Sequence, residues 1–159
     1  MYKNPIIVFE GIEGSGKSTH IKHVSSYLKK IKRKFIKIRE PGGVLTAEKI
    51  RKIILSNNSK FNSTTDLFLY FASRSENIEK IISKYYKKKI ILIDRFVDST
   101  IAYQHYGMGI DKKIILSLNN FILKKIKPDF TFLNVVSKRN LSIRLKKRRN
   151  KNKYDKFNI

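Results

Sequence analysis

Residues 11–18 combine glycine, lysine and serine at a spacing suited to binding phosphate groups. They read Gly-Ile-Glu-Gly-Ser-Gly-Lys-Ser, follow a short apolar run and precede a helical pattern. Glycines let backbone N–H groups turn around phosphate oxygens, and the start of the helix adds the positive end of its dipole. Lys17 can reach the β- and γ-phosphates of a nucleoside triphosphate, and the Ser18 hydroxyl can bind Mg²⁺. The predicted ATP-binding residues are Gly11, Ile12, Glu13, Gly14, Ser15, Gly16, Lys17, Ser18 and Thr19.

Glu13 is an unusual residue inside such a loop. Its carboxylate would lie close to the negative charge of the phosphates, which is unfavourable without a partner. We therefore expect Glu13 to have a specific partner, such as a sugar hydroxyl or a cation. The alternative is a solvated loop glutamate.

Asp94 and Arg95 directly follow an apolar run of strand length at residues 90–93. In an open α/β sheet, ligands bind beyond the carboxyl ends of the strands. Asp94 is then placed to order water bound to Mg²⁺, and Arg95 can bind a phosphate with its planar set of donors. A local ion pair between the two side chains is the alternative.

Tyr70 and Arg74 lie four residues apart in a predicted helix, so both side chains project from one face. A ring and a guanidinium there can hold a nucleobase by stacking and hydrogen bonding, although aromatic residues at helical spacing more often belong to a core. Arg39 follows another apolar run, and Arg51 lies in the next helical pattern. Arginines that converge near a sheet edge suit an acceptor phosphate, whereas each one singly is more typical of a solvated surface.

Short apolar runs alternate with helical patterns along the chain. The runs cover residues 6–9, 35–38, 90–93 and 130–136, as is typical of strands covered on both faces. Five helices are predicted between and after these runs. The first follows the glycine loop, and the second includes Ala47, Ile50 and Ile54. The others extend over about 66–84, over about 111–125, and onward from about Ser137. This alternation predicts an α/β fold, a parallel sheet of about four strands between helices with right-handed crossovers. We expect one domain over residues 1–159.

The chain has 36 lysines and arginines against 12 aspartates and glutamates, a formal net charge of +24. Such a charge can indicate a nucleic-acid or acidic partner. The abundance of Lys, Ile, Asn, Tyr and Phe also fits compositional drift, and a basic surface suits phosphorylated substrates. We therefore favour drift and substrate electrostatics over a dedicated nucleic-acid site.

Cysteine is absent, which excludes disulfides, thiolate metal sites and cysteine nucleophiles. No apolar run approaches the roughly 20 residues that a membrane helix needs. The N-terminus also lacks the apolar stretch and cleavage site of a secretory signal. We expect a cytoplasmic protein without a membrane partner.

Taken together, these segments resemble the thymidylate kinase family of the bacterial type. The matching motifs, in the family's order and spacing, are residues 10–19, 39–43, 71–74 and 94–104. The resemblance implies the P-loop NTPase-type sheet of nucleoside monophosphate kinases. It also implies transfer of the γ-phosphoryl group of ATP to dTMP, with Mg²⁺ as cofactor.

The resemblance implies a role for each matching residue. Glu13 would bind the 3′-hydroxyl of the deoxyribose, and Arg74 would contact the thymine. Arg95, with Arg39 or Arg51, would hold the acceptor phosphate. The remaining implied substrate contacts are Tyr70, which would stack on the base, Ser99 and Gln104, which would line the base pocket, and Tyr103, which would pack against the sugar.

The resemblance further implies a lid at residues 148–159 that brings an arginine to the transferring phosphate. Lys156 stands where an arginine usually follows aspartate, and Arg148 or Arg149 can take its place. The predicted catalytic residues are Lys17, Arg95, Arg149 and Lys156, and the predicted metal ligands are Ser18 and Asp94. Family members continue past the lid into a further strand and helices, so the resemblance implies a shortened chain. It also suggests a homodimer built on helices.

The residues are also compatible with two other functions. One is another P-loop kinase that acts on a nucleoside or a different monophosphate. The other is a non-catalytic nucleotide-binding protein, retained as a basic nucleic-acid binder.

Overall fold

The computed structural model describes residues 3–146, in which strands and helices alternate along the chain. In chain order they are β1 (Ile6–Glu10), α1 (Lys17–Lys30), β2 (Phe35–Arg39), α2 (Leu45–Leu55), α3 (Ser63–Asn77), the π-helical turn η1 (Ile78–Ile82), α4 (Ser83–Tyr85), β3 (Ile90–Asp94), α5 (Val97–Thr100), the π-helical turn η2 (Ile101–Tyr106), α6 (Lys112–Leu123), β4 (Phe130–Leu133) and α7 (Lys138–Lys146). No helix among residues 3–146 is long and apolar enough to cross a membrane.

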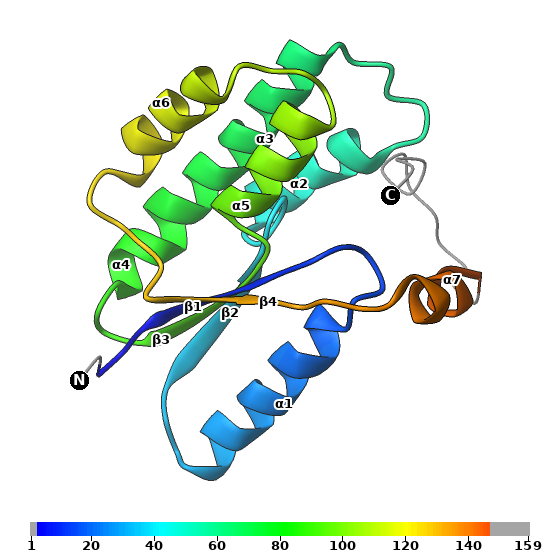
Figure 1. Ribbon diagram of the computed structural model, residues 1–159. Helices are drawn as coiled ribbons and strands as arrows, with labels where there is room; N and C mark the ends of the chain where they lie inside the picture. The colour runs from blue at the N-terminus through cyan, green and yellow to red at the C-terminus, as the bar shows by residue number, and fades with distance from the viewer. Residues whose placement is uncertain (1–2, 147–159) are drawn as a thin grey trace.

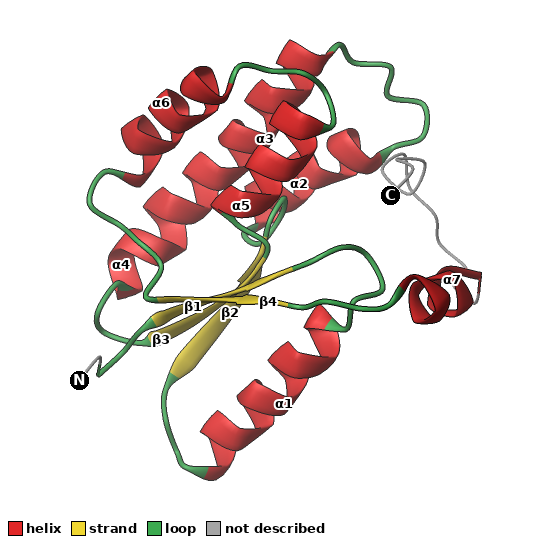
Figure 2. Cartoon of the chain, viewed as in Figure 1, coloured by secondary structure: helices red, strands yellow, loops and turns green. Residues whose placement is uncertain are grey.

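The four strands form one parallel sheet in the order β2-β3-β1-β4 (Figure 2). This confirms the predicted α/β fold with about four parallel strands. The last strand is shorter than expected, because it ends at Leu133 and the chain leaves the sheet before residue 136.

Helices cover the two faces of the sheet unequally. Figure 1 shows α1 below the sheet and α2, α3 and α6 above it. Successive side chains of a strand point to opposite faces, so β3 contributes to both layers of the core. Ile90 and Leu92 pack in the cluster that contains Leu28 of α1, whereas Ile91 and Ile93 pack in the cluster that contains Ile78 of η1.

Two helical segments differ from the sequence-based expectation. The predicted helix over 66–84 begins earlier, at Ser63, where the Asn62 side chain accepts a hydrogen bond from the N–H of Thr65, and it passes through the π-helical turn η1. The segment 97–106 was not predicted to be helical but forms α5 and η2. Its β-branched residues disfavour a helix locally, so the contacts described below must hold it.

The parallel topology brings three loops to one edge of the sheet. The carboxyl ends of β1, β2 and β3 lead into the glycine loop, residues 40–44 and Arg95, respectively. Because parallel strands place all their carboxyl ends together, these three segments face a common site.

Candidate active site

The glycine loop is held tightly between β1 and α1. Gly11 has φ +134°, and a Cβ at this position would lie 2.5 Å from the backbone oxygen of Asn134, after β4. Gly14 has φ +76°, and a Cβ at this position would lie 3.2 Å from Cδ1 of Leu141 in α7. Both positions therefore require glycine, one for space and both for the left-handed backbone.

Lys17 is buried at the start of α1 and folds back over this loop. Its Nζ donates to the carbonyl oxygens of Gly11 at 2.8 Å and Ile12 at 2.9 Å. Burial, followed by the positive charge of Arg95, lowers the pKa of Lys17 from 10.5 to about 8. The ammonium is thus positioned beside the loop, in surroundings that only partly compensate its charge.

A single cavity of about 700 Å³ joins the glycine loop to the acceptor-side residues. This volume is in the range typical of small-molecule sites. The predicted residues that line it are Glu13, Gly14, Ser15, Gly16, Lys17, Ser18, Thr19, Arg39, Arg51, Tyr70, Arg74, Asp94, Arg95, Ser99 and Tyr103. Gly11 and Ile12 line a neighbouring cavity instead.

Arg95 lines this cavity and contacts three of its other lining residues. Its Nη2 lies 3.5 Å from Oε1 of Glu13, and its Nη1 donates to Oγ of Ser99 at 3.2 Å. Its guanidinium also lies 5.4 Å from the ring centroid of Tyr103. The partner expected for Glu13 is thus a cation, and Arg95 pairs with Glu13 from the other side of the site.

Asp94 and Arg51 also line the cavity, and burial makes the charged form of each side chain less favourable. Burial raises the pKa of the Asp94 carboxyl, against the opposing effects of Lys17 and Arg95. Burial, followed by the charge of Arg39, lowers the pKa of Arg51. Arginines whose charges repel one another in a cavity provide a favourable place for an anion.

The loop after β2 is fixed by side chains of α2 and α3. Arg39 forms two hydrogen bonds with Glu48, at 2.9 and 2.8 Å, and Nη1 of Arg51 donates to the carbonyl oxygen of Pro41 at 2.6 Å. Asn77 of α3 donates to the carbonyl oxygen of Gly42 at 2.6 Å and accepts from the N–H of Val44 at 3.1 Å. Arg39, at the end of β2, and Arg51, in α2, are therefore held on either side of this loop, and both line the cavity.

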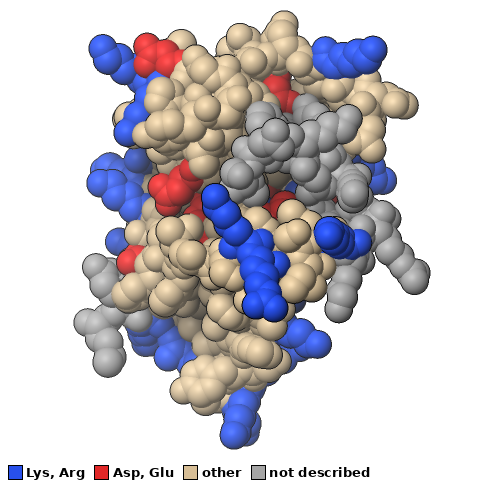
Figure 3. Space-filling model, turned by 45° about the vertical axis from the view of Figure 1, so that its right-hand side comes forward, with Lys and Arg blue, Asp and Glu red and all other residues tan. Residues whose placement is uncertain are grey.

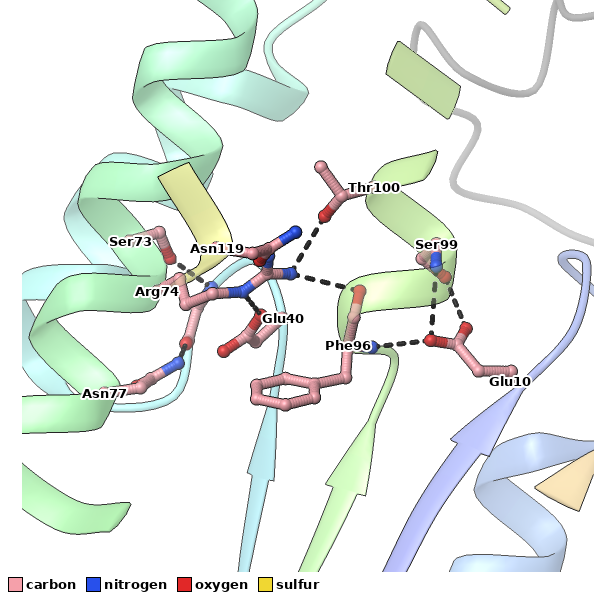
Figure 4. A network of polar contacts seen from close by, with 10 residues as sticks. Glu10, Glu40, Ser73, Arg74, Asn77, Phe96, Ser99, Thr100 and Asn119 are labelled. Atoms are coloured by element: carbon pink, nitrogen blue, oxygen red, sulfur yellow. Dashed lines mark hydrogen bonds and ion pairs between the residues drawn. The ribbon is translucent and has the colours of Figure 1, made fainter. Parts of the chain in front are cut away.

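Arg74 lines the cavity and also joins several elements (Figure 4). Its Nε donates to Glu40 at 2.7 Å and its Nη1 to Asn119 of α6 at 2.6 Å. Its Nη2 donates to the carbonyl oxygen of Phe96 at 3.0 Å and to Thr100 Oγ1 at 2.8 Å. These bonds engage four of its five N–H groups, so the side chain is a structural centre as well as a candidate base contact.

Glu10, at the end of β1, is a site residue that the sequence reasoning missed. Its buried carboxylate accepts the N–H groups of Phe96 at 2.7 Å and Ser99 at 3.2 Å, and also the Ser99 hydroxyl. Figure 4 shows these bonds at the start of α5. A carboxylate at this position satisfies unpaired N–H groups and complements the helix dipole. The glutamate that ends β1 and precedes the glycine loop was the available signal.

Arg144 of α7 is a second residue that was missed. Its Nη1 donates to the carbonyl oxygen of Gly14 at 2.8 Å, and its side chain lines the cavity. The lid residues expected to supply positive charge there, Arg148, Arg149 and Lys156, lie outside the described residues, as does the whole predicted lid at 148–159.

Gln104 is the predicted site residue that the structure does not bring to the cavity. It is fully buried in η2, and its Nε2 donates to Asp66 of α3 at 3.4 Å. Neither cavity described here includes it among its lining residues. The turn from α5 into η2 places Tyr103 at the cavity and Gln104 against α3, so Gln104 does not line the cavity in this structure.

Among residues 3–146, no three histidine or acidic side chains gather as a metal-binding group. Ser18 and Asp94 nevertheless line the same cavity. Mg²⁺ usually keeps several waters and takes one or two protein oxygens besides the phosphates of its substrate. This sparse donor set therefore fits Mg²⁺ bound together with a nucleotide.

Comparison with known proteins gives consistent matches. A family model described as thymidylate kinase matches residues 9–159. The chain is 45% identical over 127 residues to a thymidylate kinase of Thermosipho africanus, covering 79% of this chain and 63% of that protein. It is 40% identical over 155 residues to one of Kosmotoga olearia, covering 96% of this chain and 73% of that protein.

A solved structure is similar as well. The crystal structure of thymidylate kinase from Ehrlichia chaffeensis matches with a TM-score of 0.78 and 39% sequence identity. The match covers 89% of this chain and 78% of that chain.

Proposed function

This chain belongs to the thymidylate kinase family, and on that premise we propose that it transfers the γ-phosphoryl group of ATP to dTMP, giving ADP and dTDP. The observation that carries the proposal is the shared cavity. The glycine loop lines one part of it, and Arg39, Arg51 and Arg95 line another. Two phosphorylated substrates can therefore meet in one cavity.

The proposed reaction needs no nucleophile from the protein. A phosphate oxygen of dTMP attacks the γ-phosphorus, the bond from that phosphorus to the β–γ bridging oxygen breaks, and ADP leaves. Catalysis by this chain is then positioning and charge neutralisation. The loop amides and Lys17 hold the β- and γ-phosphates, and Arg95 holds the attacking phosphate.

Ser18 and Asp94 would hold Mg²⁺, Ser18 directly and Asp94 through ordered water. The ion supplies charge neutralisation on the β- and γ-phosphates when it is bound with ATP. Burial raises the pKa of Asp94. A bound cation would oppose this effect and stabilise the ionised carboxylate.

On the acceptor side, Tyr70 would stack on the thymine and the remaining N–H group of Arg74 would donate to it. Tyr103 would pack against the deoxyribose, where its ring leaves little space for a 2′-hydroxyl. Glu13, beside Arg95 at 3.5 Å, would accept from the 3′-hydroxyl. Ser99, bonded to Arg95 at 3.2 Å, would orient the phosphate-binding guanidinium.

Arg144 gains a role in this proposal because its Nη1 already reaches the carbonyl oxygen of Gly14. We propose that it adds positive charge beside the phosphates of ATP. The remaining charge would come from Arg149 or Lys156 in a lid at 148–159, within a single domain of residues 1–159.

We also propose a homodimer in the cytoplasm, with α2 and α3 at the contact between subunits. Ile53 of α2 is 47% exposed and Phe68 of α3 is 55% exposed. These helices pack against each other on the same side of the sheet (Figure 1), so their exposed apolar side chains can form one surface.

The direct test is an assay of ADP release with purified protein, ATP and Mg²⁺. We expect turnover that depends on dTMP and saturates at a lower concentration of dTMP than of dUMP, dCMP or AMP. Lys17→Met should lower kcat at least about 100-fold, because the positive charge that stabilises the transferring phosphate is lost. Tight ATP binding without dTMP-dependent turnover would contradict the proposal, and equal use of another monophosphate would contradict the assigned acceptor.

A further inference from the structure

Three loops lie at the end of the sheet opposite the candidate active site, where the strands begin. They connect α1 to β2, α4 to β3, and α6 to β4, and each one enters the amino end of a strand. Figure 1 shows these connections on the side away from the glycine loop. Side-chain hydrogen bonds join two of them to the N-terminal segment, since the Asn4 amide donates to the carbonyl oxygen of Lys87 at 3.0 Å and the Arg33 guanidinium donates to Oδ1 of Asn4 at 3.3 Å.

Basic residues are concentrated in these loops and the helix ends that precede them. Residues 29–34, 84–89 and 124–127 hold five, four and three lysines and arginines, respectively, and no acidic residue. Twelve of sixteen positions are therefore basic, whereas the whole chain has 36 in 159. Every one except the half-buried Lys89 is exposed. We call these three segments the basic edge.

Nearby carboxylates neutralise only a small part of this surface. Glu79 pairs with Lys124 at 3.2 Å, and the Asp129 carboxylate accepts the N–H of Ile6 at 2.7 Å. Figure 3 shows lysine and arginine side chains projecting from the lower end of the molecule, where α1 ends. The positive charge of the edge thus faces solvent.

Helix dipoles and substrate electrostatics do not account for the basic edge. Cations stabilise a helix only within its last turn, and just Lys29, Lys30 and Lys84 lie in such turns. The candidate active site lies at the other end of five-residue strands, about 17 Å away at about 3.3 Å per residue. This distance is about twice the screening length of about 8 Å in physiological salt.

We propose that the basic edge binds double-stranded DNA through its phosphates. Strands about 4.8 Å apart make the four-stranded sheet about 14 Å wide. Duplex DNA carries one charge per about 1.7 Å, so about eight phosphate charges can lie along this width. The proposed surface is separate from the proposed kinase site and does not depend on that function.

The side chains of the edge favour phosphates over bases and over membranes. Lys89 and Lys84 lie 4.1 and 5.5 Å from the ring centroid of Tyr85, and Lys87 lies 5.4 Å from that of Tyr86. Lysines over these rings leave little open surface for base stacking. Ile31 is the one exposed large apolar side chain in the three segments, whereas membrane-surface binding uses an apolar face.

The test uses two variants with equal net charge. The edge variant replaces Lys30, Lys34, Lys88, Lys125 and Lys127 with Gln, and the control variant replaces Lys49, Lys52, Lys60, Lys112 and Lys113 with Gln. All ten lysines are exposed. Binding to a fluorescein-labelled 20-base-pair duplex is measured by anisotropy between 50 and 200 mM KCl. Circular dichroism of each variant, compared with the unsubstituted protein, shows that the protein remains folded.

We expect the intact protein to bind the duplex with a steep salt dependence, a slope of about −0.9 in log–log form for each phosphate neutralised. The edge variant should lose at least about tenfold in affinity and about four units of that slope, and the control should lose less than about threefold. Saturating ATP should leave duplex binding unchanged. Equal losses in both variants, displacement of the duplex by ATP, or binding to phosphatidylserine vesicles without binding to the duplex would each overturn the proposal.

Discussion

At the scale of single residues, Lys17 and Arg74 show that one side chain can serve both the fold and the site. Lys17 binds the carbonyl oxygens of its own loop, and a triphosphate would compete with these contacts for the ammonium. Arg74 is 2% exposed and donates hydrogen bonds to four residues of three segments. Its candidate role toward thymine therefore depends on a guanidinium that the protein has already fixed in position.

The lowered pKa of Lys17 predicts a pH dependence of ATP binding. With a pKa of about 8 in the free protein, the ammonium is present below pH 8 and is lost as pH rises through that value. ATP affinity should therefore fall between pH 7 and 9, which calorimetry can measure. In Lys17→Met, affinity should be weak and nearly constant over that range, and an equal pH dependence in this variant would contradict the assignment.

The lowered pKa of Lys17 also makes the free energy of unfolding depend on pH. The unfolded chain has the higher lysine pKa of 10.5 and binds more protons between pH 8 and 10.5. The contribution of Lys17 to stability should therefore rise with pH across this window.

At the scale of elements, α5 depends on a partner at the other end of the sequence. The Glu10 carboxylate, at the end of β1, binds the N–H groups of Phe96 and Ser99, which are 86 and 89 residues away. Val97 and Thr100, which are poor helix formers, can then take up a helix whose first N–H groups are satisfied. The position of Ser99, and through it Arg95, follows from this contact.

Glu10→Gln tests this arrangement. The amide of Gln cannot accept all three hydrogen bonds, so unfolding free energy should fall by about 1–3 kcal/mol for a buried donor left unpaired. KM for dTMP should rise about tenfold, since a hydrogen bond to a charged group is worth about 1.5 kcal/mol, with ATP affinity unchanged. Chemical denaturation and steady-state kinetics measure both effects.

The matched variant is Ser99→Ala, which removes the hydroxyl but keeps the two N–H groups. It should raise KM for dTMP with little loss of stability. Destabilisation of Glu10→Gln with an unchanged KM for dTMP would show that Glu10 acts only in folding.

At the scale of the whole molecule, the two ends of the sheet differ in chemistry. The carboxyl edge gathers the glycine loop and the arginines of the cavity, whereas the amino edge gathers lysines without a cavity of its own among those described. The helical layer of α2, α3 and α6 lies beside both edges and exposes apolar side chains such as Phe68. Each surface can therefore bind a different kind of partner.

Phe68→Glu tests the proposed homodimer. A charge placed in an apolar contact must be desolvated, so we expect this variant to have half the mass of the unsubstituted protein in size-exclusion chromatography with light scattering. Tyr27→Glu is the control, because Tyr27 is 61% exposed on α1, on the other face of the sheet. A dimer that survives Phe68→Glu but not Tyr27→Glu would place the contact on α1 instead.

Features that depend on neighbouring residues can be predicted from the sequence. The glycine spacing, the four apolar runs and the placement of Asp94-Arg95 after a strand predict a parallel sheet with a phosphate site at its carboxyl edge. These features follow from local periodicity and from the rule that parallel strands share one functional edge.

Contacts between distant residues become visible in the folded chain alone. The tertiary structure placed Glu10 on α5, Arg144 on Gly14 and Gln104 away from the cavity, and it gathered three separate basic segments at one edge. Such contacts depend on how loops close and on how side chains fill the core, and these are properties of the packed chain. The spacing of residues within one segment therefore does not predict these contacts.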